Sequence, residues 1–122
     1  MRIFKTKWFA RYARREQIRD RSLCEAVLRA EQGLVDADLG GNVIKQRVAR
    51  AGQGRSGGYR MLVAFRSKAR AVFLYGFAKN ERDNIDNDEL TTLREIAAAW
   101  LTADTDQIER AIAEGILQEI DP

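Results

Sequence analysis

Hydrophobic positions in the first third of the chain recur every three or four residues. The first such stripe is formed by Trp8, Phe9, Tyr12 and Ala13, and the second by Leu23, Ala26, Val27 and Ala30. This spacing predicts two helices, over residues 7–18 and 21–33, with Ser22 as a plausible N-cap of the second. A short apolar start at Ile3 and Phe4 predicts an edge strand before them.

After the loop VDADLGGN the pattern changes to two-residue alternation, which is typical of strands. Three strands are predicted, near residues 43–49, 58–66 and 70–77. The alternation around Met61 and Val63 indicates a half-buried strand, with one packed face and Arg60 on the other. The run AVFLYGF is apolar at nearly every position, which indicates a central strand buried on both faces.

Helical spacing returns in the last third of the chain. Asp86 and Glu89 resemble a capping box, and the residues from Asp88 onward predict a helix that docks on the sheet. A final helix is predicted over residues 105–119, where isoleucines recur at steps of four: Ile108, Ile112, Ile116 and Ile120. The elements indicate an α+β fold: two N-terminal helices packed on a small antiparallel sheet, followed by C-terminal helices.

Length and composition restrict the classes of protein. With 122 residues the chain is expected to form one domain. The only cysteine, Cys24, is interpreted as a core residue that forms no internal disulfide, and without a signal peptide or a membrane span a cytoplasmic protein is expected. The absence of histidine removes the usual proton shuttle and many metal ligands, so we expect no metal and no cofactor.

Charge is distributed unevenly behind a net charge of +3. Residues 39–80 contain no Asp or Glu, whereas residues 81–122 are strongly acidic. The basic residues of the acid-free block are Lys45, Arg47, Arg50, Arg55, Arg60, Arg66, Lys68, Arg70 and Lys79. Such a block predicts a face that binds a polyanion, most simply a nucleic acid.

Three cations of this block are expected to converge. Lys45 and Arg47 lie two residues apart on a strand and therefore share a face, and Arg60 follows on the next strand beyond the glycine-rich loop GQGRSGG. Taken singly, each is better explained as a solvated surface cation whose stem covers apolar surface. Taken together they indicate a ligand site, because converging cations repel one another unless they bind an anion.

The segments IKQRVA, GGYRMLVAF and AVFLYGFAKNERDNI resemble the RelE/ParE superfamily of toxins from type II toxin–antitoxin systems, most closely its RelE/HigB-like branch. The resemblance covers residues 1–101 and implies a RelE-like toxin domain. Residues 102–122 are expected to form an acidic amphipathic helical extension of the same domain. The resemblance also implies a metal-independent endoribonuclease, an mRNA interferase that enters the ribosome, cuts mRNA there and inhibits translation. A cognate antitoxin, expected to be a helix-turn-helix DNA-binding protein, would hold it inactive.

The resemblance assigns roles to individual residues. The implied catalytic residues are Lys45, Arg47, Arg60 and Lys79, and the implied RNA-binding residues are Arg50, Arg55, Arg66, Lys68, Asn80 and Arg82. Asn80 stands where RelE has an arginine, and Asp86 is nearest to the position of a RelE tyrosine.

These departures leave the acid of the reaction unassigned. Lys45 would act as the base, since neighbouring cations disfavour its charged form, and the other three would stabilise the phosphate. Two alternatives remain open at this point: a non-enzymatic, ParE-like inhibitor of DNA gyrase, and an RNA-binding module without catalysis.

Overall fold

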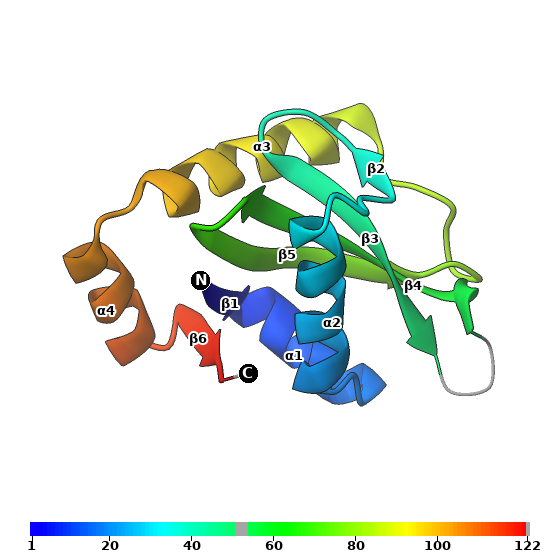
Figure 1. Cartoon of the computed structure of the whole chain (residues 1–122), viewed down its shortest axis with the longest axis horizontal. Coiled ribbons are helices and arrows are strands. Elements are labelled where there is room, and N and C mark those ends of the chain that lie inside the picture. The colour runs from blue at the N-terminus through cyan, green and yellow to red at the C-terminus, as the bar shows by residue number, and fades with distance from the viewer. Residues whose placement is uncertain (51–53, 122) are drawn as a thin grey trace.

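A mixed sheet runs through the middle of the molecule, with helices on both of its faces (Figure 1). The computed structural model describes residues 1–50 and 54–121, and side chains from residue 57 in the second range. Six strands lie within these ranges: β1 (Arg2–Thr6), β2 (Ala37–Asp38), β3 (Val43–Arg50), β4 (Gly54–Arg66), β5 (Arg70–Ala78) and β6 (Leu117–Ile120). Their order across the sheet is β2-β3-β4-β5-β1-β6.

The three central strands confirm the predicted hairpins. β3, β4 and β5 pair in sequence as antiparallel neighbours. The predicted edge strand and the purely antiparallel sheet are wrong, because β1 lies inside the sheet, parallel to β5 and antiparallel to β6. Its partner β6 is at the other end of the chain, so local spacing could not reveal this position.

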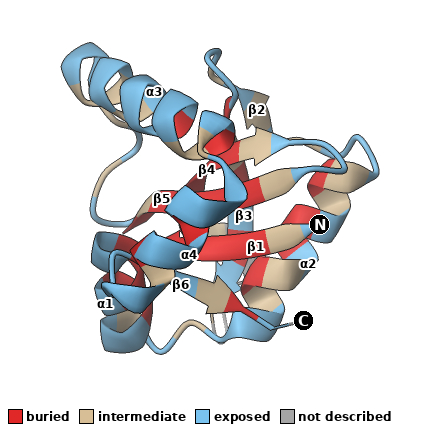
Figure 2. Cartoon of the chain, turned by 90° about the vertical axis from the view of Figure 1, so that its left-hand side faces the viewer, coloured by how far each residue is buried: buried red, intermediate tan, exposed pale blue. Residues whose placement is uncertain are grey.

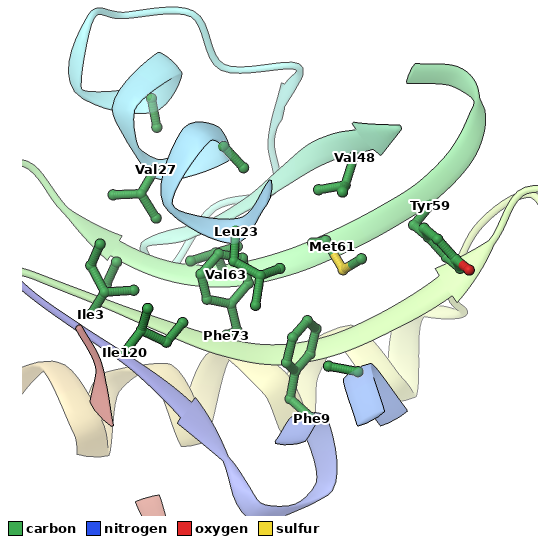
Figure 3. Close-up of a cluster of buried hydrophobic side chains, with 14 of the residues drawn as sticks. Ile3, Phe9, Leu23, Val27, Val48, Tyr59, Met61, Val63, Phe73 and Ile120 are labelled. Carbon is green, nitrogen blue, oxygen red and sulfur yellow. The ribbon is translucent and has the colours of Figure 1, made fainter. Parts of the chain in front are cut away.

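Two helices, α1 (Lys7–Glu16) and α2 (Asp20–Glu31), form the predicted helical hairpin on one face of the sheet. The Thr6 hydroxyl caps α1 by accepting a hydrogen bond from the Phe9 N–H at 3.2 Å. The prediction that Ser22 is the N-cap of α2 is wrong. Arg19 holds that position and makes no side-chain capping hydrogen bond. Figure 3 shows the core beneath this hairpin, where Phe9 and Leu23 point toward Phe73 of β5.

The opposite face is covered by α3 (Asn87–Thr102) and α4 (Thr105–Ala113). The predicted capping box of α3 is confirmed: Asp86 accepts from the Glu89 N–H, and the Glu89 carboxylate accepts from the Asp86 N–H. A second apolar core lies under these helices, formed by Phe4, Val43, Leu62, Ala64, Val72, Leu74, Ala97, Leu101, Ile108, Ala111 and Leu117. Figure 2 shows burial concentrated on the strands between the two helical layers.

Because both faces of the sheet are covered by helices, β4 and β5 are buried on both sides. The prediction that β5 is buried on both sides is confirmed, since Ala71 through Leu74 are all buried. The prediction that β4 is half-buried is wrong, because Met61 and Val63 belong to one core while Leu62 and Ala64 belong to the other. Even Arg60 is only 8% exposed.

The C-terminal segment is a helix followed by a strand, so the single helix predicted over residues 105–119 is wrong. Helix α4 ends at Ala113, and Gly115 follows with a φ of +75°, a left-handed conformation that suits glycine. The Ile116 N–H then donates to the Ala111 carbonyl at 2.8 Å, which closes the helix end. The chain continues as β6, which buries Leu117 and Ile120 against β1.

Candidate functional site

The sheet face under α3 ends in a group of cations on β3 and β4. Lys45 is paired with Leu62, and Arg47 lies directly opposite Arg60. Directly opposed residues of antiparallel strands point to the same face, so all three cations share the face on which α3 packs. Lys45 is half-buried and Arg47 is exposed, whereas Val43, four residues before Arg47, is fully buried. The structure therefore brings together the three cations that the sequence predicted to converge. We call Lys45, Arg47 and Arg60 the basic cluster.

Arg60 is the most buried residue of the basic cluster. Burial and the neighbouring charge of Arg47 lower the pKa of its guanidinium, and Asp36 partly offsets this. Asp36 also accepts a hydrogen bond from the Arg47 backbone N–H at 2.7 Å. Sequence reasoning missed this carboxylate, because it lies before β2 and outside the acid-free block. β2 and β3 are antiparallel neighbours, which is how Asp36 comes to lie beside Arg47.

Two aromatic residues of β5 extend the same face. Tyr75 is paired with Leu62, and Phe77 with Arg60, so both side chains lie on the side of the basic cluster. In the sequence, Tyr75 is only one residue of the apolar run AVFLYGF, which predicts a buried strand and no role for its hydroxyl. A register shift in the β4–β5 ladder at Leu62 turns Tyr75 to this face, and that shift has no signature in the local sequence.

Arg82 joins this face to α3. Its guanidinium lies over the Phe77 ring, 5.7 Å from the centroid, and donates to the Tyr75 hydroxyl at 3.4 Å. It also forms an ion pair with Glu89 at 2.7 Å, which raises the pKa of Arg82 and lowers the pKa of the Glu89 carboxyl to about 2. Arg82, expected to bind RNA, is thus held against the site by a carboxylate. Asp86 serves as the N-cap of α3, which occupies its carboxylate.

Lys79 and Asn80 lie at the end of β5, on the same end of the sheet as Arg60. Both side chains are exposed. The Lys79 N–H donates to the Gly58 carbonyl at 3.0 Å, and Gly58 is two residues before Arg60 on β4. Lys79 therefore borders the basic cluster, as predicted from its place in the strand exit.

Other cations of the acid-free block lie elsewhere. Arg50 lies over the Tyr59 ring at 5.5 Å, on the face covered by α1 and α2. Arg66 ends β4 and donates to the Leu101 carbonyl at 3.3 Å, and Lys68 follows in the next turn. Six residues of extended strand separate Arg66 from Arg60, roughly 20 Å. The side chain of Arg55 is outside the described residues. The block is thus divided among two faces and two ends of the sheet.

An aromatic stack connects α1 to this site. The Trp8 ring is stacked on Tyr75 with centroids 4.6 Å apart and on Tyr12 with centroids 5.3 Å apart. The Arg15 guanidinium lies over the Tyr12 ring at 5.3 Å. Although Trp8 belongs to the apolar stripe that predicted this helix, 46% of it is exposed. The stack fixes the first helix relative to the β5 side of the site.

An apolar groove of about 570 Å³ lies beside the site, between α3 and the start of α1. Its hydrophobic lining consists of Trp8, Leu74, Tyr75, Leu93, Ile96, Trp100 and Ile116. The predicted docking stripe of α3 is only partly buried, because Ala97 and Leu101 are covered whereas Ile96 is exposed. The groove suits apolar side chains and offers little to a phosphate.

Other kinds of site find little support in the described ranges. Burial raises the pKa of the Cys24 thiol, which disfavours the reactive thiolate. Within residues 1–50 and 54–121, no group of three or more acidic or cysteine side chains is placed to hold a metal ion. In the same part of the chain, no helix has the length and apolar character needed to span a membrane.

Comparison with known proteins gives one family. The family model described as RelE toxin of the RelE / RelB toxin-antitoxin system matches residues 1–120. The match continues past residue 101, where the resemblance was expected to end, and it includes α4 and β6. No curated protein matches the chain.

Proposed function

Since the chain belongs to the RelE toxin family of toxin–antitoxin systems, we propose that it is a ribosome-dependent endoribonuclease that cuts translated mRNA and thereby inhibits translation. The observation that supports this activity best is the register of β3 and β4, which gathers Lys45, Arg47 and Arg60 on one face of the sheet. A cationic site of this kind needs neither histidine nor a metal ion to act on a phosphodiester. We therefore propose a metal-independent reaction.

The basic cluster can support cleavage by the RNA's own 2′-hydroxyl. In such a reaction the 2′-oxygen attacks the adjacent phosphorus, the bond to the 5′-oxygen breaks, and a 2′,3′-cyclic phosphate and a 5′-hydroxyl result. Lys45 in its neutral form would accept the 2′-hydroxyl proton. Arg47 and Arg60 would hold the negative charge that develops on the phosphate, with Lys79 at the border of the site. The desolvated position of Arg60 strengthens its interaction with an anion.

The proton for the leaving 5′-oxygen requires another group, and we assign it to Tyr75. The chain has three tyrosines. Tyr12 and Tyr59 contribute to the core beneath α1 and α2, whereas Tyr75 lies on the face of the basic cluster. The Arg82 guanidinium donates to the Tyr75 hydroxyl, which orients the phenol and would stabilise the charge it acquires after giving up its proton.

Two partners follow from this function. RelE toxins pair with an antitoxin, and we propose that the cognate antitoxin here is a helix-turn-helix DNA-binding protein. The second partner is the ribosome with its mRNA. Because the protein site is built mainly of cations, the ribosome would supply much of the geometry of the cleaved strand.

Mapping of mRNA ends after brief induction tests the activity. Wild-type protein and an exposed-surface control, Arg110→Ala, should produce new 5′ ends inside translated regions, in phase with codons. Arg60→Ala should produce none at an equal protein level. Growth arrest with intact mRNA and inhibited DNA supercoiling would instead indicate a ParE-like gyrase inhibitor. Translation arrest without cleavage, equal in wild type and Arg60→Ala, would indicate a non-catalytic RNA-binding module.

A further inference from the structure

The exposed side of α1 carries cations that the candidate active site does not use. Lys7, Arg11, Arg14 and Arg15 follow one another at spacings of four, three and one residues, which places them on one side of the helix. All four are exposed. We call Lys7, Arg11 and Arg14 the α1 ridge, because Arg15 differs from them in its contacts.

The α1 ridge lacks the acidic partners that other cations of this protein have. Arg2 pairs with Glu109 and Glu119, each at 2.8 Å, and Lys5 pairs with Asp20 at 2.8 Å. Arg15 lies 3.5 Å from Glu16. No carboxylate among residues 1–50 and 54–121 forms an ion pair with a ridge residue. Like charges on adjacent turns destabilise a helix. An anionic partner that neutralises these charges would explain why the α1 ridge carries them.

Hollows flank the ridge on both sides. Arg11 and Arg14 line one of about 540 Å³ together with Trp8 and Tyr12, and a second of about 340 Å³ together with Lys7 and Ala10. The cations thus stand between two depressions of the surface. A chain of phosphates could lie along the ridge, with sugars or bases accommodated at its sides.

The ridge is held in a fixed position relative to the active site. Trp8, which lies between Lys7 and Arg11 in the sequence of α1, is stacked on Tyr75 of β5. Tyr75 in turn accepts the hydrogen bond from Arg82. An RNA segment bound on the ridge would therefore be held in register with an mRNA strand bound at the basic cluster.

We propose that the α1 ridge is a second RNA-binding surface, which takes the phosphate backbone of ribosomal RNA while the basic cluster acts on mRNA. The inference rests on the proposed function for the identity of the RNA. Lys7 to Arg14 spans about 10 Å of helix axis, a length over which one nucleic-acid strand presents about three phosphates. Protein interfaces usually have an apolar centre, and the ridge residues are all charged, which favours RNA over an acidic protein.

Affinity for programmed 70S ribosomes tests the proposal. The double variant Arg11→Ala/Arg14→Ala is compared with a matched control, Arg21→Ala/Arg110→Ala, which removes the same charge from exposed positions on α2 and α4. Both pairs are built into the Arg60→Ala protein so that mRNA stays intact. We expect the ridge variant to bind about tenfold more weakly or worse at physiological salt, with the control close to the parent. The slope of log affinity against log salt should fall by roughly two.

Each other outcome overturns the inference. Equal ribosome affinity of the ridge variant and the control would show that the ridge does not bind RNA. A loss of antitoxin affinity with unchanged ribosome affinity would assign the ridge to the antitoxin. Failure of the proposed function would give a different result, because the protein with Arg60 intact would then bind ribosomes without cutting mRNA. The comparison of the two double variants would still show whether the α1 ridge binds RNA. Thermal unfolding of both variants confirms that the fold is retained.

Discussion

The sheet face beneath α3 has two ends that differ sharply in composition. At the covered end, Phe4, Val43 and Val72 are fully buried under α3 and α4. At the open end, β3 and β4 carry the basic cluster, and β5 carries Phe77 and Tyr75 beside it. On β3, the change from a buried apolar side chain to an exposed charged one takes place within four residues, between Val43 and Arg47. A continuous strand therefore passes from apolar core to charged surface without a break.

This difference shows how the fold supports an unfavourable arrangement. Arg47 and Arg60 face each other across two strands, and directly opposed like charges destabilise a sheet. The two apolar cores that flank the central strands supply the compensating stability. Because both arginines are on strands rather than loops, the sheet fixes their spacing without any ligand. The covered end thus supplies stability, and the open end supplies the site.

The largest expected effect is the loss of cleavage on Lys45→Gln at the open end. Removing a general base reduces reaction rates by roughly 10²- to 10⁴-fold. Lys45 is half-buried, so Gln should leave thermal stability nearly unchanged. Cleavage of mRNA in a purified translating system measures the rate, with Arg21→Gln as an exposed control. A Lys45→Gln protein that cuts at the wild-type rate would exclude Lys45 as the base.

At the covered end, Phe4→Ala should show the reverse behaviour. Phe4 is fully buried, and large-to-small aromatic substitutions in cores cost about 3–5 kcal/mol in unfolding free energy. Urea unfolding measures this loss, and cleavage is then normalised to the folded fraction. The activity of each folded molecule should match wild type. A loss of activity beyond the unfolded fraction would show that the two ends are not separable.

Tyr75→Phe tests the proposed role of the Tyr75 hydroxyl in protonating the leaving oxygen. We expect cleavage to fall by about 10²-fold, at the lower end of the range for a general acid, because Arg82 stays in place. The ring stack with Trp8 is retained by Phe, so the loss would arise from the hydroxyl alone. Ribosome affinity is measured in parallel. Reduced affinity with an unchanged cleavage rate at saturation would make Tyr75 a binding residue instead.

Much of the difference between the covered end and the open end could be predicted from the sequence. Alternation predicted β3 and the part of β4 from residue 58, and a continuous apolar run predicted β5. The two-residue spacing of Lys45 and Arg47 predicted that they share a face. The capping box of α3 was also evident, because it is a local signal. The pairing of Arg47 with Arg60 needed only the hairpin between two adjacent strands. Short-range contacts of this kind leave a pattern in the sequence.

Features that depend on distant segments left no such pattern. The position of β1 inside the sheet depends on its pairing with β6. The isoleucine spacing wrongly predicted helix for the residues of β6, although Gly115 marks the end of the helix. Asp36 reaches the basic cluster through the β2–β3 pair, and Tyr75 faces it because of an irregularity in the ladder. The acid-free block suggested one surface, but strand length carries Arg66 and Lys68 to the other end of the sheet.

Gly58→Ala should affect both the stability of the fold and the geometry of the basic cluster. A Cβ at Gly58 would lie 2.3 Å from the Val48 carbonyl oxygen and 2.8 Å from the Arg50 nitrogen, so β3 would have to shift. We expect a loss of about 1–3 kcal/mol in unfolding free energy, as for other overpacked sites. Activity per folded molecule should also fall, because Arg60 is two residues away. Unchanged activity would mean that the basic cluster tolerates movement of β3.

The smallest effect is expected at Glu89, where α3 of the covered end meets Arg82 of the open end. The Arg82 guanidinium lowers the pKa of Glu89 from the ordinary 4.5 to about 2. A carboxyl whose pKa is lowered on folding stabilises the protein above its unfolded pKa, and this contribution is lost as the pH falls through the folded pKa. Glu89→Gln keeps a side chain suited to the capping box, so it removes mainly the charge.

The two proteins should therefore differ in stability at neutral pH and converge as the pH falls from about 4.5 toward 2. Urea unfolding of wild type and Glu89→Gln across this window measures the convergence. Cleavage by Glu89→Gln should decline only modestly, because Arg82 loses its ionic anchor but keeps its place over Phe77. A stability difference that does not change with pH would mean that Glu89 acts through the helix cap, and the link between the two ends would then not be electrostatic.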